Sequence, residues 1–188
     1  MFFEKNAKLL ADFTRLSQTA GARADYVQGG GGNTSVKLAD GLMAIKASGY
    51  CLKDINVDKA YAVMDAQALR KFYYENEPAN LEDVEKQGSA CAKENTKTIE
   101  GLAALRPSVE AGFHSILKTF VLHTHSVYAN LAACTVGGKQ KLTAIFGQSF
   151  FLFFRQRMES FNNIRNIISV NIINPIFHIL VDFTKIIM

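Results

Sequence analysis

Two histidines separated by one residue are the clearest chemical feature of the chain. His123 and His125 lie in the segment VLHTH, and the apolar residues around them predict a β-strand over residues 119–125. Alternate side chains of a strand point to the same face, so both imidazoles are expected to project side by side. Such a pair can bind a divalent transition metal, with zinc favoured over copper, iron or nickel. An isolated pair at this spacing is more often structural.

An acidic residue upstream could complete a metal site. Glu110 is expected near the start of a helix that begins at Pro107 and ends near Leu117. An antiparallel return of the chain into the histidine strand would place the Glu110 carboxylate beside the metal. The alternative is an ordinary acidic residue that interacts with the helix dipole. His114 lies one turn further along this helix, and a structural role in the core is favoured for it over a role as ligand.

Two loops carry residues that can hold an anion. Four consecutive glycines, residues 29–32, precede Asn33, Thr34 and Ser35. Ordering four glycines is entropically costly, and the cost is tolerated where backbone N–H groups must approach an anion closely. The spacing matches neither of the two glycine-rich nucleotide-binding motifs. Ser48-Gly49 follows a predicted strand and offers a hydroxyl and an unobstructed amide. Taken alone, the first segment is more often a flexible connector and the second a simple turn.

Alternating helices and strands are expected to position these loops. The spacing of apolar residues, capping residues and turn residues predicts helices over residues 4–19, 66–74, 83–98, 107–117 and 126–133, and strands over 33–38, 42–47, 61–64 and 119–125. Asp40-Gly41 is the expected turn between the first two strands, and Asp65 is the expected cap of the second helix. This order indicates an α/β or α+β sandwich with its chemistry at loops and strand ends.

Length and composition exclude several classes of protein. The 188 residues are 48% hydrophobic and 20% charged, which suits one folded domain and excludes a disordered chain, collagen and a coiled coil. Three widely spaced cysteines do not make a disulfide scaffold. The net charge of +4 comes from residues spread along the chain, so nucleic acid is not an expected partner. Neither a signal peptide nor a membrane span is expected, and the cytoplasm is the expected compartment.

The composition changes sharply near residue 150. Residues 1–150 contain all 13 glycines and every alanine, whereas residues 151–188 contain neither and carry nine isoleucines, six phenylalanines and five asparagines. We therefore expect a domain over residues 1–150 and a compositionally foreign tail over residues 151–188. Such a tail would arise from a shifted reading frame or another non-native extension. The alternative is a genuine apolar, β-rich C-terminus.

The order and spacing of four motifs resemble the class II aldolase/adducin family, and within it the rhamnulose-1-phosphate-aldolase-like and L-fuculose-phosphate-aldolase-like members. The resemblance covers about residues 5–147 and includes the segment KQKLTAIFG. It implies a three-layer αβα sandwich, incomplete at its C-terminal end here, that assembles into homotetramers. The motifs are, in chain order, GGGGNTSVKL, IKASGY, RPSVEAGFH and VLHTH.

The resemblance also implies roles for individual residues. His123 and His125 match the family's adjacent zinc ligands, and Glu110 matches its catalytic carboxylate. Another divalent transition metal could replace zinc. The family's third zinc-binding histidine comes from a later strand, usually within Asn-His-Gly. His178 is the histidine that remains downstream, but it lacks the following glycine and lies in the foreign tail, so it is not the expected ligand.

Three loops match the family's phosphate-binding segments. Gly32 and Asn33 fall on the first loop, Ser48 and Gly49 on the second, and Ser108 on the third. Where the family often has a further serine, this chain has Val109. One hydroxyl contact to the phosphate is therefore missing, which bears on the affinity for the substrate or on its type.

The implied activity is a reversible retro-aldol cleavage of a sugar phosphate into dihydroxyacetone phosphate and an aldehyde. Zinc would stabilise the negative charge of the enediolate as a Lewis acid, and Glu110 would move the proton at the enediolate carbon. A sugar-phosphate epimerase or dehydratase on the same scaffold is the nearest alternative. A non-catalytic, adducin-like binding module or a truncated, inactive copy is another, but a pure scaffold has no need of both the histidine pair and Glu110.

Overall fold

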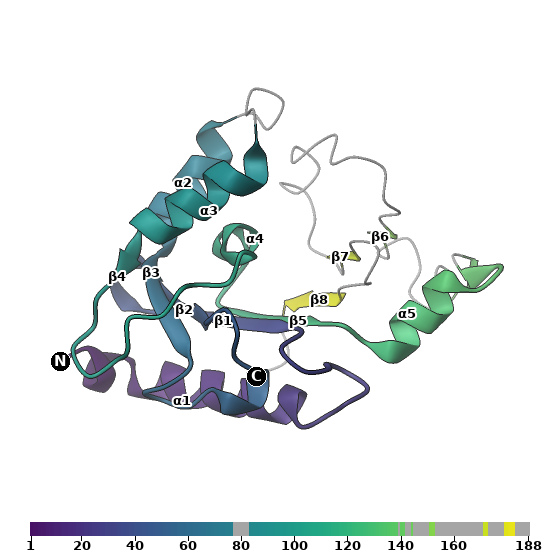
Figure 1. The fold of residues 1–188 in the computed structure, drawn as a ribbon, viewed down its shortest axis with the longest axis horizontal. Coiled ribbons are helices and arrows are strands. Elements are labelled where there is room, and N and C mark those ends of the chain that lie inside the picture. Colours follow the sequence, from purple (N-terminus) through teal and green to yellow (C-terminus); the bar gives the residue numbers. More distant parts are fainter. Residues whose placement is uncertain are drawn as a thin grey trace.

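A six-stranded antiparallel sheet forms the centre of the molecule in the computed structural model (Figure 1). The structure describes residues 1–76, 83–138, 140–141, 144, 151–152, 171–172 and 179–182. The strand order is β4-β3-β2-β1-β5-β8. The strands of this sheet are β1 (Asn33–Lys37), β2 (Leu42–Lys46), β3 (Tyr61–Asp65), β4 (Thr96–Lys97), β5 (Phe120–Thr124) and β8 (Ile179–Asp182).

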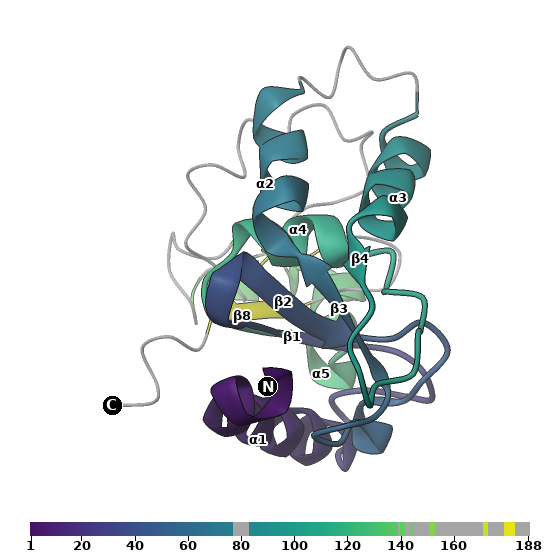
Figure 2. The same cartoon turned by 90° about the vertical axis from the view of Figure 1, so that its left-hand side faces the viewer.

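Helices cover both faces of the sheet and make three layers (Figure 2). One face is covered by α1, and the other by α2, α3 and α4, whereas α5 extends from the end of β5 (Figures 1 and 2). The predicted three-layer αβα sandwich is therefore confirmed. The helices are α1 (Phe2–Gly21), α2 (Ala66–Glu75), α3 (Val84–Glu94), α4 (Ala111–Ile116) and α5 (Val127–Cys134), with short 3₁₀ turns at Ala39–Gly41 and Leu52–Asp54.

Each face of the sheet has its own hydrophobic core. Leu10 and Phe13 of α1 are buried in a cluster with Val36 and Leu122 of the sheet. The second cluster packs sheet residues against α2, α3 and α4 and contains Met43, Ile45, Met64, Ala66, Leu69, Ala92 and Ala111. Neighbouring residues of a strand face opposite layers, so Val36 reaches the α1 layer while Ser35, next to it, faces α4.

Local sequence signals account for the N-terminal part of the fold, from α1 to the start of α2. The predicted helix over residues 4–19 is α1, longer by two residues at each end. The turn between β1 and β2 takes left-handed φ values of 58° at Asp40 and 73° at Gly41, which Asp and Gly accommodate better than other residues. Asp65 ends β3 and caps α2, with its Oδ1 accepting a hydrogen bond of 2.9 Å from the Ala68 N–H. The predictions for this region are confirmed.

Two of the predicted helices differ from the observed ones. The helix expected over residues 83–98 ends at Glu94, because Thr96 and Lys97 pair with β3 as the edge strand β4. Pro107 does not begin a helix, and that prediction is wrong. The residue forms an antiparallel bridge with Ala47, and α4 begins only at Ala111. Ser108 and Glu110 therefore lie in a loop ahead of the helix.

The histidine strand is slightly shorter than expected. β5 ends at Thr124, so His123 lies in the strand and His125 in the connection to α5. The backbone N–H of His125 donates to the Tyr26 carbonyl at 2.8 Å. This hydrogen bond fixes the residue against the loop that leads into β1.

Short strands are also found in the compositionally distinct C-terminal part. β8 pairs antiparallel with β5, with Leu180 opposite His123. Two further strands, β6 (Phe151–Leu152) and β7 (Asn171–Ile172), pair parallel with each other. The domain boundary at residue 150 lies outside the described residues and stays a prediction. Among the described residues, no helix combines the length and apolar character that crossing a bilayer requires.

Candidate functional site

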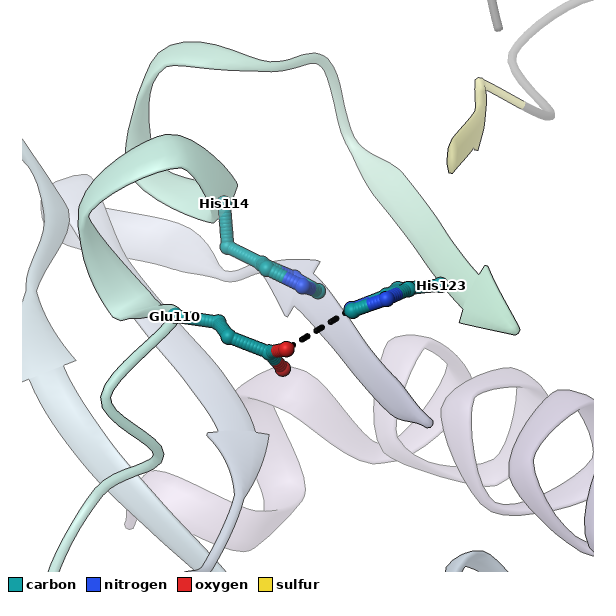
Figure 3. A group of neighbouring side chains, drawn as sticks. All are labelled: Glu110, His114 and His123. Atoms are coloured by element: carbon teal, nitrogen blue, oxygen red, sulfur yellow. Dashed lines mark ion pairs between the residues drawn. The ribbon is translucent and has the colours of Figure 1, made fainter. Parts of the chain in front are cut away.

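Three side chains that can bind a metal meet where α4 begins beside β5 (Figure 3). Each of Glu110, His114 and His123 offers a ligand atom, and these atoms all lie within 4.8 Å of one another. The Glu110 Oε1 is 3.1 Å from the His123 Nδ1. Glu110 is the last residue before α4, so its side chain points across to the strand as the sequence analysis expected. His114, for which a structural role was favoured, belongs to the same cluster.

The buried polar residues of β1 hold this cluster in place. Asn33 is paired with His123 across the sheet, and its Nδ2 donates to the Glu110 Oε2 at 2.8 Å. Two residues along the strand, on the same face, Ser35 Oγ is hydrogen-bonded to the His114 Nδ1 at 2.8 Å. Both β1 side chains are fully buried. Polar groups at these positions would destabilise a purely apolar interface, and here each orients one member of the cluster.

Electrostatics keep the carboxylate charged and one imidazole neutral. Burial by itself raises the pKa of Glu110, but its hydrogen bond and Coulombic interaction with His123 and its hydrogen bond with the Asn33 amide lower the pKa below its usual range. Burial lowers the pKa of His114 to about 3. At neutral pH the site therefore holds an anionic oxygen donor beside a neutral imidazole, the forms in which both groups bind metals.

The donor set fits a divalent transition metal. The His114 Nε2 is buried and has no hydrogen-bond partner among the described residues, while its Nδ1 is held by Ser35. Burying a ring nitrogen without a partner costs free energy unless a hydrogen-bond partner or a metal ion binds it. Imidazole and carboxylate together are donors that zinc and similar cations accept. The residues present can therefore hold such an ion.

His125 lies beside this cluster without belonging to the group of three. Its ring centroid is 5.1 Å from that of His123, with the rings inclined by 55°, so the two imidazoles are neighbours as expected. Burial and the charge of His123 lower the pKa of His125. Gly31 packs against this ring, since a Cβ at that position would lie 2.9 Å from the His125 Nδ1. The glycine loop and the histidine pair are thus in direct contact.

The first of the three expected anion loops needs glycine for steric reasons. Gly32 has a φ of 71°, and a Cβ there would lie 2.5 Å from the Val27 Cγ1 and 2.9 Å from the His123 carbonyl oxygen. Asn33, directly after it, contacts Glu110 as described above. This loop is therefore an ordered wall of the candidate site.

The second and third expected loops are joined to each other. Ser48 and Gly49 are exposed, and the Ser48 N–H donates to the Arg106 carbonyl at 2.9 Å. Ser108 is largely buried, and its Oγ lies 3.4 Å from the Glu110 Oε2. Val109, where the resemblance leads one to expect a further serine, is 56% exposed. The hydrogen bond between Ser48 and Arg106 thus joins the second loop to the third, and Ser108 of the third loop lies beside Glu110.

Lys46 is a site residue that the sequence analysis missed. It ends β2 and is only 4% exposed, and its Nζ donates to the carbonyls of Gly30 at 3.1 Å and Tyr50 at 2.8 Å. Burial lowers the pKa of Lys46, whereas the nearby Glu110 raises it. The available signal was a charged residue that ends the apolar strand segment LMAIK, with one alanine between it and Ser48-Gly49.

Some residues of the resemblance lie outside the described part of the structure. These are His178, Lys139 and most of the segment that follows Lys139.

Comparisons with known proteins point to one family. The model of the class II aldolase and adducin N-terminal domain matches residues 12–169. No curated protein matches the chain.

Two solved structures agree with this fold. The N-terminal class II aldolase domain of a conserved protein from Thermoplasma acidophilum superposes with a TM-score of 0.61 at 21% identity, covering 75% of this chain and 65% of that one. An aldolase II superfamily protein from Pseudomonas syringae gives 0.57 at 14% identity, covering 94% and 66%. An L-fuculose 1-phosphate aldolase gives 0.40 at 25% identity, covering 66% and 49%. The chain thus spans a little under two thirds of the first two structures and about half of the third.

Proposed function

Because the chain belongs to the class II aldolase and adducin N-terminal domain family, we propose that it is a zinc-dependent aldolase acting on a sugar phosphate. The reaction is the reversible cleavage of a ketose 1-phosphate into dihydroxyacetone phosphate and an aldehyde. The observation that carries the proposal is the position of the Glu110 carboxylate, held between His123 and Asn33 beside the glycine loop. A carboxylate and imidazoles at one end of an anion-binding loop suit proton transfer next to a phosphate group.

The metal would be held by the histidines around Glu110. His123 and His125 are the proposed ligands, Glu110 lies beside them, and His114 presents a further neutral imidazole to the same space. A divalent cation there supplies a Lewis acid that offsets the negative charge of an enediolate. Ser35 fixes the ring of His114 through its Nδ1, which leaves the Nε2 as the ring nitrogen without a hydrogen-bond partner among the described residues.

Glu110 is the proposed proton carrier. In the direction of bond formation its carboxylate takes a proton from the hydroxyl-bearing carbon of dihydroxyacetone phosphate, and in cleavage it returns the proton to that carbon. The lowered pKa of Glu110 keeps it ionised before substrate binds, which is the form that can accept a proton. The Asn33 amide orients one carboxylate oxygen, and Ser108 lies near the same oxygen.

The three loops are the proposed site for the substrate phosphate. Backbone N–H groups of Gly32, Asn33 and Gly49 and the hydroxyls of Ser48 and Ser108 are donors of the kind that bind phosphate. Binding the phosphate at this end would position the reacting carbon beside Glu110. The loops lie next to the Glu110 cluster through Asn33 and Ser108, and this proximity supports the assignment.

A product assay tests the proposal. Zinc-loaded protein is incubated with a panel of ketose 1-phosphates, and dihydroxyacetone phosphate is measured alongside the remaining sugar. We expect cleavage by the wild type, and a loss of at least about a hundredfold in Glu110→Gln with the zinc content retained. Lys53→Met, an exposed change nearby, is the control and should leave the rate unchanged. Unchanged cleavage in Glu110→Gln would refute the role of Glu110 as proton carrier. An epimerised or dehydrated product in place of dihydroxyacetone phosphate would show that the protein is an epimerase or a dehydratase and not an aldolase.

Assembly belongs to the same proposal. By resemblance to the family, we expect homotetramers with each site near a subunit interface. Light scattering of the purified protein measures this directly, and a monomer at micromolar concentration would contradict it.

A further inference from the structure

Lys46 is a buried cation at the junction of two loops, and the proposed reaction gives it no role so far. It lies at the end of β2, where the strand meets Ser48-Gly49, and the first anion loop passes beside it on the way into β1. Burying an ammonium group costs free energy unless hydrogen bonds and nearby charges compensate it. The contacts of Lys46 therefore show which groups compensate the burial of its charge and what role the lysine can have.

Both hydrogen bonds of the ammonium go to the backbone of these loops. One acceptor is the carbonyl of Gly30, in the glycine loop, and the other is the carbonyl of Tyr50, directly after Gly49. The two acceptors are 20 positions apart in the sequence, so the lysine links two separate segments of the chain. Charge-assisted hydrogen bonds are about twice as strong as neutral ones, which suits a link that must hold four flexible glycines.

The charge of Lys46 also acts on the site itself. Its ammonium interacts electrostatically with Glu110 and His125, so it is close enough to influence both. A charge inside the protein is screened less by salt than a charge on the surface. A buried cation beneath two loops rich in N–H groups would raise their affinity for a dianion.

We propose that Lys46 is the positioning residue of the anion subsite: its ammonium holds the glycine loop and the Ser48-Gly49 loop together and supplies positive charge for the phosphate of the substrate. The inference rests on the proposed function for the identity of the anion. The link between the loops does not depend on that function, and it can be tested without any substrate.

Three variants separate the contributions of charge and packing. Lys46→Met keeps the length of the side chain but removes both the charge and the hydrogen bonds. Lys46→Arg keeps the charge and can donate hydrogen bonds. Lys53→Met makes the same substitution at an exposed lysine seven residues further along the chain and is the matched control.

The first measurement is amide hydrogen exchange without ligand. The N–H groups of Gly31, Ser48 and Tyr50 are hydrogen-bonded to backbone carbonyls, so their exchange reports the order of both loops. We expect exchange in both loops to rise about tenfold or more in Lys46→Met and to stay near the wild-type rate in Lys53→Met. Wild-type exchange in both loops of Lys46→Met would overturn the link, whatever the enzyme does.

The second measurement is the affinity for inorganic phosphate by calorimetry. We expect binding at least about tenfold weaker in Lys46→Met, an intermediate loss in Lys46→Arg, and less than about a twofold change in Lys53→Met. Equal losses in the Met and Arg variants would overturn the role of the charge. Wild-type protein that binds no phosphate would overturn both the phosphate subsite of the proposed function and the charge role of Lys46, and the exchange result would still decide the link.

A measurement on wild-type protein covers the case in which Lys46→Met fails to fold. With ¹⁵N-labelled lysine, a buried and hydrogen-bonded ammonium gives an observable Nζ signal. We expect this signal of Lys46 to shift when phosphate is added, whereas the backbone amide signal of the exposed Lys53, labelled in the same sample, stays in place. A Lys46 signal that does not respond at phosphate saturation would contradict the proposal.

Discussion

At the scale of the residue, the site depends on pairs in which one side chain orients another. Asn33 holds Glu110, Ser35 holds His114, and Gly31 leaves room for the ring of His125. The proximity of the histidine pair to Glu110 could be predicted from the sequence, because the order and spacing of the motifs resemble those of the family and the chain returns from Glu110 into the histidine strand. The roles of Ser35 and Lys46 could not, since Ser35 depends on His114 far along the chain and Lys46 on two loop carbonyls whose positions only the folded backbone fixes.

Gly31→Ala tests the contact between the glycine loop and the histidine pair. The new Cβ would lie 2.9 Å from the His125 Nδ1 and 3.0 Å from the Gln28 carbonyl oxygen, so the ring or the loop must move. We expect zinc affinity to fall by about tenfold, a change of about 1.4 kcal/mol. The measurement is a zinc titration against a competing chelator.

Gly30→Ala is the control for this change. The nearest atom to a Cβ at Gly30 is the Tyr50 carbonyl oxygen at 3.9 Å, which is ordinary contact, so its zinc affinity should match the wild type. Equal affinities in both variants would show that the ring of His125 plays no part in binding.

At the scale of the element, the sequence predicts where most helices and strands lie but fails where two distant segments pair. α1, the β1–β2 turn and the Asp65 cap follow from periodicity and from residues with well-defined turn and capping preferences. Pro107 was assigned to a helix on its preference for a first turn, but its neighbour Arg106 accepts a hydrogen bond from Ser48 and the segment is extended. That pairing is what places Ser108 and Glu110 in a loop at the site.

Asp65→Ala tests the cap of α2. Its Oδ1 accepts a hydrogen bond from the Ala68 N–H, and its Oδ2 is 3.5 Å from the Lys97 ammonium. We expect the free energy of unfolding to fall by about 1 kcal/mol, because an unfilled N-cap leaves a helix N–H without a partner. Urea denaturation followed by circular dichroism measures the change.

Lys97→Ala separates the cap from the ion pair. It removes the partner of Asp65 but leaves the capping oxygen, and an exposed ion pair contributes little, so its unfolding free energy should stay within about 0.5 kcal/mol of the wild type. A loss as large as that of Asp65→Ala would assign the effect to the ion pair instead.

At the scale of the whole molecule, one face of the sheet carries the candidate site and the other carries an apolar core. The face toward α4 carries the polar residues of β1 and β5 that meet Glu110, while the face toward α1 is closed by Phe13, Val36 and Leu122. The fold places ionisable groups in the interior, so the stability of the protein must depend on pH.

Stability without metal should fall as the pH drops below the ordinary pKa of histidine. Burial lowers the pKa of His114 from 6.5 to about 3, so between these values the unfolded chain binds a proton that the folded chain does not. Unfolding is therefore favoured as the pH decreases through this window, by at most about 1.4 kcal/mol per pH unit from this group. Melting temperatures from pH 7.5 to 5 in a chelator measure the slope.

His114→Gln is the control for the pH dependence. It removes the titrating ring, so the decline between pH 6.5 and 5 should be shallower than in the wild type. Parallel curves for the two proteins would mean that the protonation of His114 is not linked to folding.

The most direct test of the account is the zinc content of the purified protein and of His123→Ala, measured by elemental analysis after dialysis against buffered zinc. His123 touches Glu110 and neighbours His125, so its removal should open the cluster at its centre. We predict about one zinc ion per chain in the wild type and a loss of most of it in the variant. Equal zinc in both proteins, or none in the wild type, would contradict the metal centre on which the proposed chemistry depends.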